Sequence, residues 1–162
     1  MHFVNELLLV GNVDDAQSPA PFIKSVLFVS GEHTIKPPKG VAYHYIPLKE
    51  YGEADPKDVK AAVDWMEQQP ASNQMMICCR AGMGRSVSMI IAYLVCVKGM
   101  KYDEAESLLK ARRPGTSPIP KLKQTIERVQ QMRQAGSNAG QDEGLASGHS
   151  AAPTWPQGSN SR

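Results

Sequence analysis

This 162-residue chain has no long apolar run, no excess of charge of one sign and few cysteines, and each of these shortages excludes a class of protein. Its longest apolar run, from Val87 to Val97, is much shorter than the ~20 residues that a membrane-spanning helix needs. Its charges nearly balance, with 18 Lys and Arg against 16 Asp and Glu, so it lacks the excess of basic residues that nucleic-acid binding requires. Its three cysteines are too few for a disulfide framework, and its opening residues turn polar by Asn12, unlike a signal peptide. These shortages predict a soluble, cytoplasmic protein without nucleic-acid or membrane partners, and we expect a monomer.

The last 27 residues, 136–162, differ in composition from the rest of the chain. They contain five glycines and five serines, and their only large apolar residues are Leu145 and Trp155. So little apolar surface cannot offset the entropy lost on ordering the chain. We therefore predict one domain over residues 1–135 and a disordered Gly/Ser-rich tail over residues 136–162.

Within residues 1–135, short apolar segments alternate with amphipathic ones. The segments that read as strands are Phe3–Val10, Ser25–Val29, Ala42–Pro47 and Met75–Cys79. Nearly continuous apolar runs of this length are typical of strands buried on both faces. The segments that read as helices are Lys57–Gln68, Arg85–Lys98, Asp103–Arg113 and Pro120–Met132. The predicted fold class is α/β, with a mostly parallel central sheet flanked by helices.

The candidate chemistry lies in the strand–loop–helix unit at the middle of the chain. The predicted strand Met75–Cys79 leads into a loop containing Gly82 and Gly84, and the loop leads into the most apolar helix. Glycines let the backbone curl so that successive N–H groups face one point, and a helix N-terminus adds unpaired N–H donors. The pattern predicts an anion-binding cradle. It is not a nucleotide-binding loop, because neither GxxxxGK[ST] nor GxGxxG is present.

Three side chains are placed to act in this cradle. Cys79 comes where the strand gives way to the loop, among amides that would lower the pKa of its thiol. Arg85 follows six residues later, where its guanidinium could hold two oxygens of a phosphate. The Ser86 hydroxyl could donate a hydrogen bond to the sulfur and help it leave. A nucleophilic sulfur beneath a bound tetrahedral anion predicts phosphoryl transfer through a covalent intermediate.

The segment from Cys79 to Ser86, CRAGMGRS, resembles the active-site loop of the cysteine-based protein tyrosine phosphatase superfamily. The resemblance extends from about Leu7 to Met132, and the small size of the chain is similar to the dual-specificity branch. It implies a protein phosphatase that hydrolyses phosphotyrosine and phosphoserine or phosphothreonine in phosphorylated proteins, without a metal or organic cofactor. It also implies that Cys79 attacks phosphorus and that Ser86 eases breakdown of the phosphocysteine. The residues implied to bind the phosphate are Arg80, Ala81, Gly82, Met83, Gly84 and Arg85.

The residue before the nucleophile differs from the family pattern. Such loops usually have a histidine there, whereas this chain has Cys78. Cys78 can be read as a small buried packing residue. It can also be read as a thiol that resolves an oxidised Cys79, a role for which Cys96 is another candidate.

The resemblance also implies a carboxylic acid about 30 residues before the cysteine, which protonates the leaving oxygen. Glu50 lies 29 residues before Cys79 and fits this spacing. Asp55 lies 24 residues before Cys79 and has the usual side chain, but it also suits the N-cap of the helix that follows. The sequence leaves both open as the general acid.

Because of the unusual Cys78 and the unassigned acid, a second function stays open. The chain could be a catalytically weak pseudophosphatase that binds phosphorylated partners without efficient turnover.

Overall fold

The computed structural model describes residues 1–146. The chain divides into two units after Val129, and every site residue discussed below lies in the first. Within the described residues, no helix combines the length and the apolar composition needed to cross a membrane.

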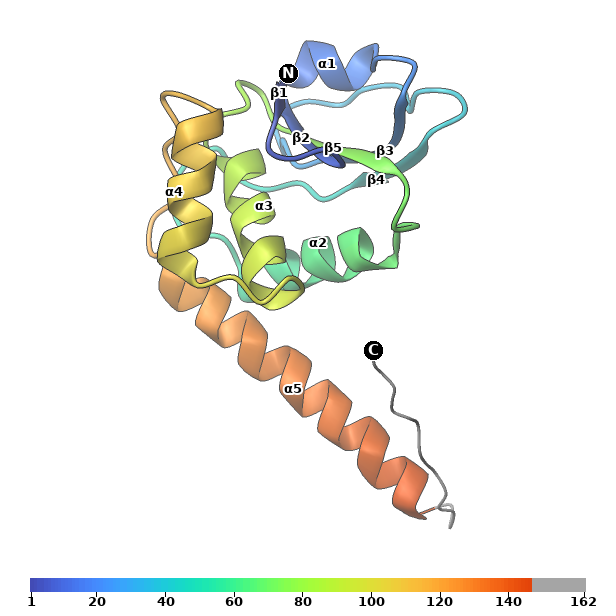
Figure 1. The fold of residues 1–162 in the computed structure, drawn as a ribbon, viewed down its shortest axis with the longest axis vertical. Coiled ribbons are helices and arrows are strands. Elements are labelled where there is room, and N and C mark those ends of the chain that lie inside the picture. Colours follow the sequence, from blue (N-terminus) through green and yellow to red (C-terminus); the bar gives the residue numbers. More distant parts are fainter. Residues whose placement is uncertain (147–162) are drawn as a thin grey trace. The chain divides into compact units, whose positions relative to one another are not determined.

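One mixed sheet forms the centre of the first unit (Figure 1). Its strands, in spatial order, are β1 (His2–Phe3), β2 (Leu8–Gly11), β5 (Gln74–Cys78), β3 (Ile23–Phe28) and β4 (Ala42–Tyr45). The pairs β2–β5, β5–β3 and β3–β4 are parallel, and only β1, at the edge, runs antiparallel to its neighbour. The prediction of an α/β fold with a mostly parallel sheet is therefore confirmed.

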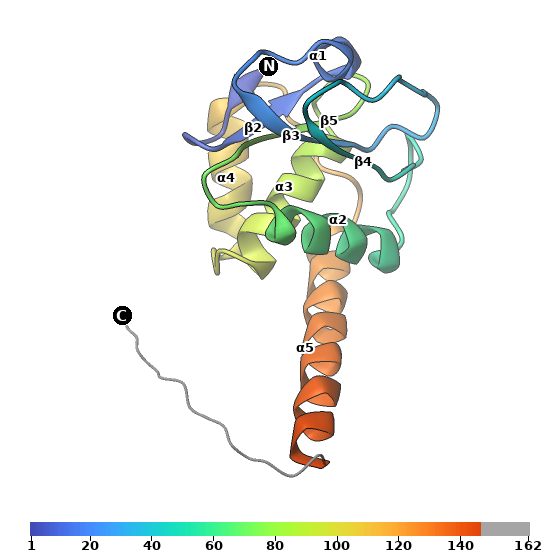
Figure 2. The same ribbon diagram turned by 90° about the vertical axis from the view of Figure 1, so that its right-hand side faces the viewer.

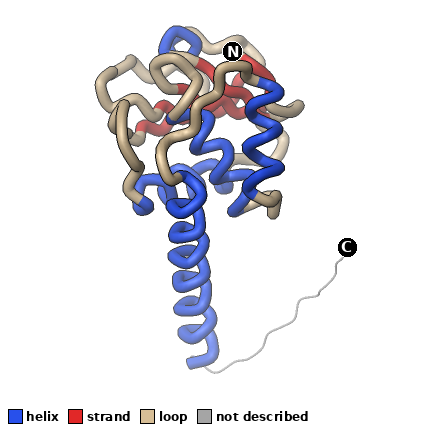
Figure 3. The backbone as a smooth tube through the Cα atoms, turned by 90° about the vertical axis from the view of Figure 1, so that its left-hand side faces the viewer, coloured by secondary structure: helices blue, strands red, loops and turns tan. Residues whose placement is uncertain are grey.

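Helices cover both faces of this sheet (Figures 2 and 3). The short helix α1 (Val13–Gln17) lies on one face. Three helices lie on the other: α2 (Pro56–Gln68), α3 (Arg85–Cys96) and α4 (Tyr102–Arg112). Helix α3 packs against both α2 and α4 and touches β2 and β5, and nine of its twelve residues are buried. This burial explains why its sequence is apolar almost all round.

Two local features near the N-terminus were not predicted. The segment predicted as one strand, Phe3–Val10, is a hairpin: the N–H groups of Val4 and Asn5 donate to the Leu8 carbonyl, and the Asn5 side chain accepts the Leu7 N–H within the turn. Helix α1 begins at a capping box in which Asn12 and Asp15 each accept the other's backbone N–H.

Helix α5 (Leu122–Ala146) extends beyond the predicted end at Met132. Residues 136–146, predicted to be disordered, are therefore helical in the structure. Glycine weakens a helix without ending it, and no proline follows until Pro153, so composition alone did not locate this end. The rest of the predicted tail, residues 147–162, lies outside the described residues.

The two faces of the sheet pack into separate hydrophobic cores. The larger core, beneath α2, α3 and α4, contains Val10, Ile77 and Cys79. The smaller core, beneath α1, contains Leu9, Met76 and Cys78. Because neighbouring residues of a strand point to opposite faces, the two adjacent cysteines enter different environments.

Candidate active site

The loop after β5 connects the carboxyl end of the sheet to the N-terminus of α3. Gly84 is the N-cap of α3 and provides no side-chain cap, so the first N–H groups of this helix have no capping partner within it. Gly82 has a φ of 70°, and a Cβ there would lie 2.8 Å from the Gly11 carbonyl oxygen of β2. Only glycine fits this close approach, which holds the loop against the neighbouring strand.

Hydrogen bonds from outside the loop hold four of its consecutive carbonyl oxygens. The donors and acceptors are Val13 N–H to Arg80 O (3.2 Å), Arg113 Nη2 to Ala81 O (3.4 Å), Arg113 Nε to Gly82 O (3.1 Å) and Ser117 N–H to Met83 O (2.8 Å). In a trans peptide the carbonyl and the following N–H point in opposite directions. The N–H groups of residues 81–84 therefore point away from these partners, toward the inside of the loop, an arrangement that suits an anion.

Cys79 lies at the base of the cradle and is only 2% exposed. Its Sγ lies 3.2 Å from the Ser86 Oγ. Burial opposes ionisation of the thiol, but hydrogen bonds from Ser86 and from the backbone N–H groups of Ser86 and Gly82, with the Arg85 charge, outweigh it. The pKa of Cys79 is consequently lowered from its ordinary value, which favours the nucleophilic thiolate.

Arg85 is held in place by two other segments of the chain. Its Nη1 donates to Glu32 Oε1 (2.6 Å) and to the Leu48 carbonyl oxygen (3.1 Å), and its Nη2 donates to Glu32 Oε2 (2.7 Å). A guanidinium has five N–H donors, and these bonds use three of them. The second N–H of Nη2 and the N–H of Nε remain available. These two donors share one edge of the planar group. They form a fork that matches two oxygens of a phosphate.

Glu50 lines the cavity above the cradle, a space of about 420 Å³ that Cys79 and Arg85 also line. The Glu50 carboxylate pairs with Nη2 of Arg80, whose Nε lies 3.6 Å from Glu32 Oε2. Glu50 therefore lines the same cavity as the nucleophile, and its carboxylate is oriented by a loop residue, Arg80.

Asp55, the other predicted acid, lies in a different position. It is the N-cap of α2, where its Oδ1 accepts the Lys57 N–H at 2.9 Å. Its side chain lines an adjoining cavity that does not include Cys79. The structure gives Asp55 the capping role that its sequence context also suggested.

Cys78 is fully buried in the smaller core. Burial raises the pKa of its thiol well above the ordinary value, so the thiol is neutral. This environment supports the packing interpretation over a resolving thiol. Cys96, the last residue of α3, is partly exposed.

Two residues that hold the site were missed by sequence reasoning. Glu32 follows β3, and Arg113 is the C-cap of α4. Because β3 pairs with β5 in parallel, residues just after both strands meet at one edge of the sheet, and this rule could have drawn attention to Glu32. Arg113 lies in the RRP segment that is part of the family resemblance, but a cation at a helix C-terminus is common, so this position was given no specific role.

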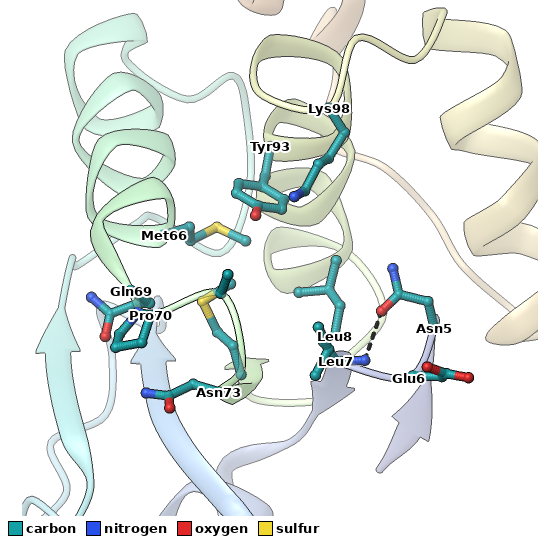
Figure 4. Close-up of a pocket in the computed structure, with 12 residues that line it drawn as sticks. Asn5, Glu6, Leu7, Leu8, Met66, Gln69, Pro70, Asn73, Tyr93 and Lys98 are labelled. Atoms are coloured by element: carbon teal, nitrogen blue, oxygen red, sulfur yellow. Dashed lines mark hydrogen bonds between the residues drawn. The ribbon is translucent and has the colours of Figure 1, made fainter. Parts of the chain in front are cut away.

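A second cavity, of about 310 Å³, contains none of the predicted site residues (Figure 4). It lies at the opposite end of the sheet, where β2 and β5 begin and α2 and α3 end. Met66 and Leu8 line it, and the Lys98 ammonium lies 5.8 Å from the centre of the Tyr93 ring.

Residues 23–132 match the family described as dual specificity phosphatase, catalytic domain. The chain belongs to this family. It is similar to the dual specificity protein phosphatase Mpk3 of Drosophila melanogaster, with 28% identity over 120 residues, which cover 69% of this chain and 29% of that protein. It is also similar to human dual specificity protein phosphatase 16, with 40% identity over 58 residues, 35% of this chain and 9% of that protein. The chain thus spans less than a third of the length of these two relatives.

Solved structures support the fold independently of the sequence. The crystal structure of human DUSP28 superimposes with a TM-score of 0.73 at 20% identity, covering 84% of this chain and 99% of that one.

Proposed function

We propose that the chain hydrolyses phosphomonoesters on phosphotyrosine and on phosphoserine or phosphothreonine of protein substrates, through a phosphocysteine intermediate on Cys79. The observation that carries this proposal is a buried thiol with a lowered pKa, 3.2 Å from the Ser86 hydroxyl, at the base of a loop whose carbonyl oxygens are held by groups outside it. Family membership supports a phosphorylated protein as the substrate.

In the first step, the Cys79 thiolate attacks phosphorus while the bond to the substrate oxygen breaks. The N–H groups of residues 81–84 and the Nε–Nη2 edge of Arg85 hold the other phosphate oxygens. Glu50, in its protonated form, gives its proton to the departing oxygen. We assign this role to Glu50 over Asp55 because only Glu50 shares the cavity with Cys79.

In the second step, water attacks phosphorus and Glu50, now a carboxylate, accepts its proton. The bond from sulfur to phosphorus breaks, and phosphate and the Cys79 thiolate are released. Ser86 donates a hydrogen bond to the departing sulfur, a role that its 3.2 Å distance from Sγ supports.

Acid quenching during turnover of a phosphopeptide, followed by peptide mass spectrometry, tests this proposal. We expect a phosphoryl group on the peptide that contains Cys79 in the wild-type protein and none in Cys79→Ser. Turnover without a cysteine-bound phosphoryl group would refute the intermediate. A wild-type protein that binds phosphopeptides without turning them over would instead support the pseudophosphatase alternative.

A further inference from the structure

The mouth of the active-site cavity combines exposed apolar side chains with few available cations. Tyr51 and Met83 both line this cavity, and they are 81% and 37% exposed. Pro118, Ile119 and Pro120 also line it. An exposed aromatic ring beside a binding cavity favours contact with an apolar group of the ligand.

The charges around the cavity restrict what can lie beside the reacting phosphate. Arg80 is paired with Glu50, and Arg85 with Glu32, so each cradle arginine already faces a carboxylate. A substrate phosphate would engage the remaining edge of Arg85, so a second phosphate would have to compete for Arg80 with Glu32, and with Glu50 whenever that group is ionised.

The adjoining cavity reinforces this restriction. It shares Gly52, Arg85 and Ile119 with the active-site cavity. Besides Arg85, its lining includes one cation, Lys49, against the carboxylates of Glu53, Asp55 and Asp58, of which Glu53 lies 3.7 Å from the Lys121 ammonium. A second phosphate placed there would face repulsion at short range.

Resting on the proposed function, we infer that the preferred substrate is a peptide segment with a single phosphate next to an apolar side chain, which Tyr51 and Met83 contact. Doubly phosphorylated segments and inositol phosphates are disfavoured by the same lining. Tyr51 and Met83 are thus specificity-determining residues.

The test uses matched phosphotyrosine peptides that differ only in the residues flanking the phosphotyrosine: leucine, alanine or phosphothreonine. We expect kcat/KM to be about 3- to 10-fold higher for leucine than for alanine, since part of one side chain becomes buried. We expect kcat/KM for the phosphothreonine peptide to be lower than for the alanine peptide, and kcat/KM for a soluble inositol phosphate to be lower than for all three peptides.

Variants test whether the preference for a flanking leucine comes from Tyr51. Tyr51→Ser should bring the leucine-to-alanine ratio close to one, whereas Tyr51→Phe should keep it, because the ring remains. Leu7→Ser, which changes an exposed apolar residue of the second cavity, is the matched control and should keep the wild-type ratio.

Equal kcat/KM values for all peptides, or a preference for the phosphothreonine peptide or the inositol phosphate, would overturn this inference and leave the proposed hydrolysis intact. A ratio unchanged in Tyr51→Ser would overturn the role of Tyr51. No turnover of any peptide or of p-nitrophenyl phosphate would refute the proposed function, and this inference with it.

Discussion

Cys78 and Cys79 are adjacent in the chain and almost equally buried, yet their thiols are in opposite electrostatic situations. Cys78 points into the core beneath α1, where burial raises its pKa. Cys79 points toward the cradle, where burial also opposes ionisation but hydrogen bonds and the Arg85 charge prevail. The comparison shows that burial by itself does not set the reactivity of a cysteine. What decides it is whether donors replace the water that burial removes.

The largest expected effect is the difference in activity between a Cys79 variant and a Cys78 variant. Cys79→Ser should lower kcat for p-nitrophenyl phosphate by at least about 10³-fold, because the nucleophile is lost. Cys78→Ala should keep kcat within about threefold and lower the free energy of unfolding by about 1–2 kcal/mol, as for a small cavity in a core. Steady-state rates and urea unfolding measure both. A comparable loss of kcat in Cys78→Ala would end the distinction between the two environments.

The pH–rate profile sharpens the comparison, because the acidic limb of kcat/KM should report ionisation of Cys79 and the alkaline limb the general acid. Glu50→Gln should lower kcat by about 10²-fold and remove the alkaline limb. Asp55→Asn is the matched control, since asparagine also caps a helix and the change is again from acid to amide. If Asp55→Asn loses the alkaline limb and Glu50→Gln keeps it, the assignment of the acid is reversed.

Ser86 provides a smaller effect on the same thiol. Ser86→Ala removes the hydroxyl that lies 3.2 Å from Sγ and that helps to lower the pKa of Cys79. The pKa should rise, so the acidic limb of the profile should move to higher pH, and kcat should fall by about tenfold as sulfur becomes a poorer leaving group. An unmoved acidic limb would show that the backbone donors and Arg85 suffice.

The smallest expected effect is on stability and comes from Glu32, which holds Arg85 in place. The hydrogen bond to Arg85 lowers the pKa of Glu32 to about 2 from 4.5. A lowered folded-state pKa stabilises the fold above the unfolded-state value, and this stability is lost as the pH falls from about 4.5 toward 2. Because the Glu32 side chain is 33% exposed, we expect its interaction with Arg85 to add only about 1–2 kcal/mol to the free energy of unfolding at neutral pH.

Urea unfolding of the wild type and of Glu32→Gln, at pH 7 and at pH 3, measures the stability contributed by the ionised Glu32. The difference in unfolding free energy between the two proteins should shrink at pH 3. An equal difference at both pH values would show that the charge of Glu32 is not its source.

The sequence predicted the parts of the site that are contiguous in the chain. Cys79, Arg85 and Ser86 were recognised because strand, glycine-containing loop and apolar helix follow one another within a few residues. Glu32, the Leu48 carbonyl and Arg113 were missed because topology, not local pattern, brings them to the loop. The same difference applies to the fold. The buried strands were predicted from their apolar runs, whereas the β1–β2 turn is held by hydrogen bonds among residues 4–8, including one to the Asn5 side chain, that leave no apolar pattern.

The most direct test of the contrast between the two cysteines is the rate of alkylation by iodoacetamide as a function of pH. Cys78→Ala and Cys79→Ala should be compared, with the modified peptides identified by mass spectrometry. We predict that Cys79 in the Cys78→Ala protein reacts with an apparent pKa below that of an ordinary thiol and is protected by inorganic phosphate. Cys78 in the Cys79→Ala protein should react only after denaturation. An ordinary apparent pKa for Cys79, or reaction of Cys78 in the folded protein, would contradict the account.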